Sequence, residues 1–192
     1  MSRTKEFDPD VALRAALDLF WRQGYEATSV QDLVDHLGVN RASIYATFGS
    51  KNELYLRALA RYGEELGGRY LTLLTGVGPA LPAVRELVES TAREALADPD
   101  NKGCFMINTA IECVPRDAGA SRMVEQGFNR LQATIAGALV RAQEQGELGS
   151  DKDPQALARF LVTFLQGIRV MAHCPEERRL NDAVDQALSL LN

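Results

Sequence analysis

The chain has 192 residues, of which 46% are hydrophobic, 24% charged and 7% aromatic, and its formal net charge is −5. This length suits one domain, or a small module fused to a larger one, and the apolar fraction excludes a disordered chain. No apolar run approaches the ~18 residues that a transmembrane helix needs. Acidic residues precede the first apolar stretch, which is not typical of a signal peptide. We therefore expect no membrane partner and a cytoplasmic location.

The excess acid is confined to the second part of the chain. Residues 1–62 hold 8 Lys/Arg and 8 Asp/Glu, whereas residues 63–192 hold 13 and 18. The two parts are therefore expected to differ in function. The three cysteines include no C-x-x-C pair, and the two histidines lie far apart in the sequence. We accordingly expect neither a disulfide framework nor a metal site, and no cofactor.

The helical period dominates nearly every long segment, and no stretch alternates convincingly as a strand. The first helix is expected to begin after Asp8, which is followed by a proline, and to end at Gly24. Thr28 and Ser29 then offer two overlapping N-caps for a short second helix, with an acidic or amide residue three positions on. Gly38 is expected to end this helix.

A third short helix is predicted between Asn40, an N-cap residue, and Gly49. The segment 50–53 has the capping-box spacing and is expected to start a fourth helix over 51–75. Beyond a Gly/Pro-containing loop, five further amphipathic helices are expected. Their ranges are 80–97, 103–113, 118–146, 154–173 and 180–191. The fold class predicted is all-α, with about nine helices.

The second and third helices, joined at Gly38-Val39, follow the helix-turn-helix plan, in which the second of the two helices enters the DNA major groove. Apolar side chains of the first three helices are expected to form a compact core. They are Leu17, Phe20, Val30, Leu33, Val34, Leu37, Ile44 and Phe48. The other side chains of the third helix are small, polar or cationic, which suits a helix that lies in a groove.

The stretch Ala15–Leu59 resembles the DNA-binding module of TetR-family (tetracycline-repressor-type) regulators. The motifs that carry the resemblance are Phe20, Gly24-Tyr25, Thr28-Ser29-Val30, Leu37-Gly38-Val39, Ser43-Ile44-Tyr45 and Tyr45-x-x-Phe48-x-x-Lys51. The all-helical remainder is similar to the family's variable regulatory domain. The resemblance implies a DNA-binding domain over 1–52 and a ligand-binding and dimerisation domain over 53–192, connected by the fourth helix.

The resemblance also implies DNA-contacting roles for eight residues. The recognition-helix positions that face bases or nearby phosphates are Arg41, Ala42, Ser43 and Thr47. Tyr45 matches the family tyrosine that reaches the DNA backbone, and Lys51 matches a phosphate-contacting lysine. Thr28 and Ser29 stand where the positive end of the second helix would hold a phosphate.

Apolar side chains from three expected helices of the second part suit a small, largely apolar ligand. They are Phe105, Phe128, Phe164 and Ile168, with Ile111 and Leu131 nearby in sequence. Asn108 and Glu112 are four residues apart and share a helix face, so they are expected to orient this ligand. A surface stripe, or a hydrogen-bonded buried pair, is an equally open interpretation of these two residues.

The helices at 154–173 and 180–191 carry broad apolar stripes that suit pairing with a second copy of the chain. If the DNA-binding modules of both chains of a symmetric dimer bind one operator, the DNA site is expected to be near-palindromic. We therefore expect a homodimeric, ligand-responsive DNA-binding regulator, and specifically a repressor that a small-molecule effector releases from its duplex DNA operator.

Three alternatives stay open. The first is a redox-responsive regulator that uses Cys104 and Cys113. The others are a helical enzyme and a scaffold protein that retains a DNA-binding head. The sequence contains no nucleophile elbow, no phosphate-binding glycine loop and no H-E-x-x-H motif. We therefore expect no enzymatic activity.

Overall fold

The computed structural model describes residues 7–192, and every regular element within this range is an α-helix. The helices are α1 (Pro9–Gln23), α2 (Val30–Leu37), α3 (Arg41–Phe48), α4 (Lys51–Thr75), α5 (Ala80–Ala97), α6 (Phe105–Glu112), α7 (Ala118–Glu144), α8 (Pro154–Met171) and α9 (Glu177–Ser189). The predicted all-α class and its nine helices are confirmed for these residues. The first six residues of the predicted module 1–52 lie outside the described residues.

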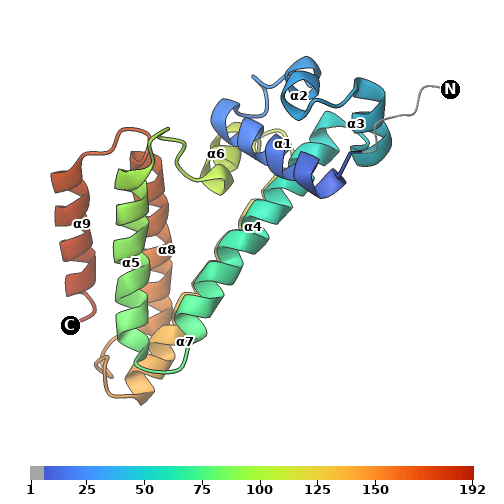
Figure 1. Ribbon diagram of the computed structural model, residues 1–192. Helices are drawn as coiled ribbons and strands as arrows, with labels where there is room; N and C mark the ends of the chain where they lie inside the picture. The colour runs from blue at the N-terminus through green and yellow to red at the C-terminus, as the bar shows by residue number, and fades with distance from the viewer. Residues whose placement is uncertain (1–6) are drawn as a thin grey trace.

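The long helix α4 connects two groups of helices (Figure 1). At its first end α1, α2 and α3 form a small head, and at its other end α5, α8 and α9 lie beside one another. Helix α7 packs along α4 and α8, while α6 contacts α4, α7 and α8. No helix between residues 7 and 192 is both long and apolar enough to span a membrane.

Residues 7–192 form a core of two clusters of buried side chains. The boundary between these clusters does not coincide with the predicted domain boundary at residue 52. The first joins the head to the beginning of α4, to α6 and to the start of α7, so that Phe20, Tyr55, Phe105 and Val124 belong together. The second joins α5, the rest of α7, α8 and α9. The head therefore rests on α6 through a continuous apolar contact.

Two helices begin at other positions than the apolar pattern predicts. Helix α6 begins at Phe105 because Gly103 has a φ of +63°, in the left-handed region, which no helix residue adopts. Helix α9 begins at Glu177, three residues before the predicted start. The Glu176 carboxylate accepts hydrogen bonds from the backbone N–H groups of Arg178 and Arg179, at 2.9 Å each, and so caps the helix.

Candidate functional site

The turn between α2 and α3 is fixed by side-chain caps at both helix starts. Ser29 caps α2: its Oγ accepts the Asp32 N–H at 3.1 Å, and the Asp32 carboxylate accepts the Ser29 N–H at 2.8 Å. Of the two predicted overlapping caps, the structure uses this one. Gly38 adopts the left-handed conformation (φ +65°) that the turn requires, and Asn40 caps α3 by accepting the Ser43 N–H at 2.9 Å.

Helix α3 is divided into a buried face and an exposed face. Ile44 and Phe48 are almost completely buried against the head core, as their spacing predicts. Arg41, Ala42 and Tyr45 are exposed. Ser43 and Thr47 are half-buried beside them. A helix held by its apolar face, with its small and cationic side chains outward, has the form that a groove-reading helix needs.

The other predicted DNA-contacting residues lie at the start of α2 and of α4. Ser29 is exposed, but Thr28 is fully buried and its hydroxyl donates to the Gly24 carbonyl oxygen at 2.6 Å. The structure thus places the Thr28 hydroxyl inside the loop before α2, bonded to the backbone. The Lys51 ammonium lies 4.2 Å from the centre of the Tyr25 ring, at the edge of the same loop.

Glu112, predicted to orient a ligand, instead joins the body to the head. Its carboxylate accepts the backbone N–H groups of Tyr25 (3.0 Å) and Glu26 (2.8 Å) in the loop after α1. A Cβ at Gly24 would come within 2.9 Å of a Glu112 carboxylate oxygen, so the loop needs a glycine there. Two backbone donors, one half-buried and one exposed, facing one carboxylate make this a charge-assisted contact.

A second contact joins head and body at the other end of α6. The Trp21 indole N–H donates to the carbonyl oxygen of Gly103 at 3.2 Å. The Trp21 ring meets the Tyr62 ring edge to face, at 5.0 Å between centres, and the Lys102 ammonium lies 4.8 Å from the indole. The contacts of Trp21 and of Glu112 thus join the head to the body at both ends of α6.

Asn108 likewise connects two parts of the body. Its amide donates to the Lys102 carbonyl oxygen at 2.9 Å, and its Oδ1 is 3.0 Å from His173 Nε2. It therefore fixes the start of α6 to the end of α8. Of the predicted apolar ligand residues, Phe105 is buried among the rings of Tyr55 and Tyr62, while Phe164 and Ile168 belong to the core cluster of the body.

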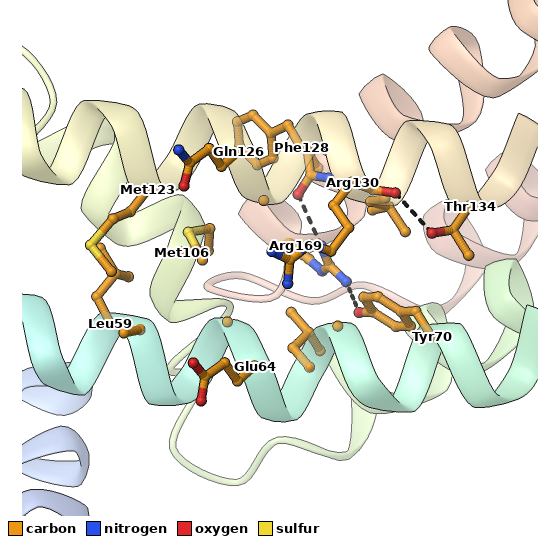
Figure 2. A pocket seen from close by; sticks show the side chains of 17 residues that line it. Leu59, Glu64, Tyr70, Met106, Met123, Gln126, Phe128, Arg130, Thr134 and Arg169 are labelled. Carbon is orange, nitrogen blue, oxygen red and sulfur yellow. Dashed lines mark hydrogen bonds between the residues drawn. The ribbon is translucent and has the colours of Figure 1, made fainter.

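A cavity of about 190 Å³ lies between α4, α6, α7 and α8 (Figure 2). Phe128 and Leu131, both named in the predicted apolar ligand group, line it. The rest of its apolar wall is outside that prediction and includes Leu59, Leu66, Met106 and Met123. The signal that could have found this site is the pair Gly63 and Gly67 on α4, since both line the cavity.

The polar groups of the cavity come from α4, α7 and α8. The Arg169 guanidinium donates to Gln166 Oε1 at 3.0 Å and to the Tyr70 hydroxyl. Figure 2 shows Arg169 between α4 and α7, with its guanidinium reaching Tyr70. Arg169 is 8% exposed, and burial lowers the pKa of its guanidinium. Exposed Glu64 and Arg130 also line the cavity.

The two cysteines of the redox alternative are both buried thiols beside tyrosines of α4. Cys104 Sγ accepts the Tyr62 hydroxyl at 3.3 Å, and Cys113 Sγ lies 3.5 Å from the Tyr55 hydroxyl. Burial raises the pKa of both thiols. A raised pKa lowers the thiolate fraction and with it the reactivity.

A capped helix-turn-helix head on a hollow helical body defines a DNA-binding regulator of the ligand-sensing class. Comparison with known sequences agrees. The model described as "Bacterial regulatory proteins, tetR family" matches residues 12–58, and "Tetracyclin repressor-like, C-terminal domain" matches residues 80–188. The chain belongs to the TetR family of transcriptional regulators.

Relatives of full length support this assignment. The chain is 38% identical to the HTH-type transcriptional regulator YezE of Bacillus subtilis (strain 168), over 100% of both chains. It is 30% identical to the HTH-type transcriptional repressor ComR of Escherichia coli (strain K12), over 88% of this chain and 81% of ComR. Among solved structures, a cysteine mutant of the TetR family regulator CifR complexed with 26-bp operator DNA superposes with a TM-score of 0.87 at 30% identity, covering 100% of each chain.

Proposed function

We propose that this regulator is a repressor that binds a near-palindromic duplex operator as a homodimer and is released when a small molecule enters the α4–α6–α7–α8 cavity. The observation that carries the proposal is the position of α6. Met106, in its first turn, lines the cavity, and Glu112, at its last residue, holds the loop before α2. One short helix therefore touches both the ligand space and the DNA-binding head.

The exposed face of α3 supports the DNA-binding part of the proposal. Arg41 and Tyr45 stand on the outer side of a helix that is anchored by Ile44. We assign base reading to Arg41, because an arginine can donate two hydrogen bonds to guanine. We assign backbone contacts to Tyr45 and Lys51, which position the head and carry no sequence information. The operator complex of CifR and the repressor description of ComR are consistent with these roles.

Apolar side chains left exposed on α8 and α9 support the homodimer. Phe160 and Val170 on α8 are 40% and 43% exposed, and the ring of Phe160 stacks on that of Phe164 with 5.9 Å between centres. Leu190, directly after α9, is 43% exposed. Large exposed apolar side chains on adjacent helices are typical of a subunit contact. We therefore assign the interface to the segments 154–173 and 180–191.

The release step follows from linkage. The dimer can adopt a conformation in which the spacing of its two heads fits the operator and another in which it does not. A ligand that binds the second conformation more tightly lowers operator affinity by the ratio of its affinities for the two conformations. DNA then weakens ligand binding by the same factor. A coupling of about 1–3 kcal/mol corresponds to a change of about 5–150-fold in operator affinity. We assign the transmission to α6, whose movement at Met106 would shift the carboxylate of Glu112.

The experiment is a binding titration with duplex DNA from upstream of the protein's own gene, at several salt concentrations. We expect a steep loss of affinity with salt, as phosphate contacts require. Tyr45→Phe and Lys51→Ala should weaken binding to all duplexes by similar factors. Arg41→Ala should change base discrimination by about 1–3 kcal/mol. Arg93→Ala, on the exposed side of α5, is the matched control. Wild-type binding by all three head variants would contradict the assignment.

A further inference from the structure

Arg169 of α8 is a buried cation in the wall of the cavity. The residue is 8% exposed and lies in the last turn of α8, on an otherwise apolar buried face of the helix. Its acceptors are the amide oxygen of Gln166, at 3.0 Å, and the hydroxyl of Tyr70. The Tyr70 ring centre lies 5.4 Å from the guanidinium carbon. Both acceptors are neutral, and a guanidinium carries five N–H donors.

No carboxylate of residues 7–192 pairs with this guanidinium within 4.0 Å. Burial is the main cause of the lowered pKa of the Arg169 guanidinium. Tyr62 acts to raise this pKa, and Arg69, a second cation on α4, acts to lower it. A buried charge without a counter-charge is costly, and folded proteins normally pair it. The local potential at Arg169 is therefore that of an anion site.

The neighbouring side chain supplies a second unused donor. Gln166 Nε2 is buried and has no hydrogen-bond partner among the described residues. Buried polar groups in native proteins are almost always paired, so an orphaned amide N–H₂ points to a missing acceptor. Gln166 and Arg169 both line the cavity. Two sets of donors thus face one space, and the Glu64 carboxylate that also lines this space bonds neither of them.

The size and wall of the cavity limit the rest of the ligand. A dry apolar cavity of about 150 Å³ holds a benzene molecule. The present cavity, at about 190 Å³, has room for one ring or a short chain and a small polar head. The rest of its wall combines Leu, Met and Phe side chains of α4, α6 and α7 with Gln126, Arg130 and Thr134 of α7. The apolar part of this wall favours a ligand that carries an apolar group.

We propose that the cavity takes a small organic carboxylate, whose carboxylate accepts hydrogen bonds from Arg169 and Gln166 and whose ring or short chain lies against Leu66, Phe128 and Leu131. A monoanion fits better than a phosphate dianion, because Arg169 is the one buried cation of the wall and the exposed Glu64 carboxylate lies at its edge. This inference rests on the proposed ligand-responsive function and names the chemical class of the effector.

The first test compares matched acids and amides on the full-length protein without DNA. Benzoate, phenylacetate and hexanoate are titrated by calorimetry beside benzamide, phenylacetamide and hexanamide. We expect each acid to bind about 10- to 100-fold more tightly than its amide, as hydrogen bonds between charged groups imply. Arg169→Met should remove this preference, whereas Arg93→Met on α5 should keep it. Equal affinity for acids and amides, or no binding of any acid at millimolar concentration, would overturn the proposal.

A second variant adds a readout that needs no ligand, and it covers the case in which Arg169→Met fails to fold. Gln166→Glu places a carboxylate of nearly the same shape beside Arg169, where it replaces the ligand's charge. We expect a higher Tm without ligand and a loss of acid binding. A lower Tm with unchanged acid binding would contradict the proposal.

Acid binding that depends on Arg169 without any change in operator affinity supports this inference but overturns the ligand-release function. Release of the operator by the amides and not by the acids would support the ligand-release function but overturn the inference that the ligand is a carboxylate.

Discussion

The carboxylate of Glu112 accepts the backbone N–H of Glu26 at 2.8 Å, across 86 residues of sequence. The same carboxylate accepts the N–H of Tyr25, so two successive N–H groups of the loop before α2 are satisfied by the body of the protein. The orientation of the helix-turn-helix is thereby linked to the position of α6. Loss of this carboxylate would leave two donors without an acceptor, which is costly where they are shielded from water.

Glu112→Gln tests this link. A glutamine offers one acceptor oxygen, and its amide N–H₂ would face the other loop N–H. We expect the free energy of unfolding to fall by about 1–3 kcal/mol. We also expect the ligand-induced loss of operator affinity to shrink, because α6 no longer holds the loop. Urea unfolding and operator titrations with and without ligand measure the two effects. Glu125→Gln, exposed on α7, is the control. An unchanged ligand response would disprove transmission through Glu112.

Phe160 and Leu161 are neighbours on α8 that should respond differently to the same substitution. Leu161 is fully buried in its own chain, whereas Phe160 is 40% exposed on the proposed interface. We expect Phe160→Glu to give folded monomers, because it places a charge in the subunit contact. Leu161→Glu should instead unfold the chain, because it buries the charge in the core. Light scattering and circular dichroism separate the outcomes, and a dimeric Phe160→Glu would place the interface elsewhere.

The cysteines should differ in reactivity. Cys174 is exposed, whereas Cys104 and Cys113 are buried and have a raised thiol pKa. We expect an alkylating reagent to modify Cys174 rapidly and the other two only after unfolding. Mass spectrometry of time points measures this order. Rapid modification of Cys104 or Cys113 in the folded protein would instead favour the redox-responsive alternative.

Asp117 gives a prediction for the dependence of stability on pH. Its carboxylate accepts the Ala120 N–H at 2.9 Å, capping α7, and also accepts the Asn52 amide of α4. These hydrogen bonds, the one from Ala120 first, lower its pKa from the ordinary value of 3.8. A lowered pKa in the folded state adds stability that is present above about pH 4 and is lost as the pH falls through the folded-state value.

We therefore expect Asp117→Ala to cost about 0.5–2 kcal/mol at neutral pH, as for other N-caps. The difference from the wild type should narrow as the pH falls below 3.8, because both chains then lack the charged cap. Denaturant unfolding at a series of pH values measures it. Asp151→Ala, in the exposed loop before α8, is a suitable control. A difference that grows in acid would show that the carboxylate is not the stabilising species.

Much of the fold could be predicted from local signals. Asp8, Ser29, Asn40 and Ser50 each cap a helix as their spacing indicates, because capping depends on a few adjacent residues. The exposed face of α3 follows from the burial of Ile44 and Phe48 in the same way. Periodicity shows which residues share a face of a helix.

The cavity and the contacts of α6 could not be predicted in this way, because periodicity does not show what a helix face meets. Glu112 and Asn108 share a face of α6, but that face meets backbone groups of the head and His173 of α8. The stripe of α8 was interpreted as a subunit contact, yet Leu161 packs within its own chain. The burial of Arg169 could have been predicted, because it stands eight residues after Leu161 and so falls on the buried face of α8.

The position of Trp21 gives the protein an optical reporter of its own conformation. It is the one tryptophan of the chain, it belongs to α1 of the head, and its indole N–H is bonded to Gly103 of the body. Indole emission is sensitive to the polarity and hydrogen bonding of its surroundings, so any shift of head against body changes the environment of this single fluorophore. Unlabelled protein, excited at the tryptophan band, would therefore report the conformational change itself, separately from the occupancy of the cavity or of the DNA.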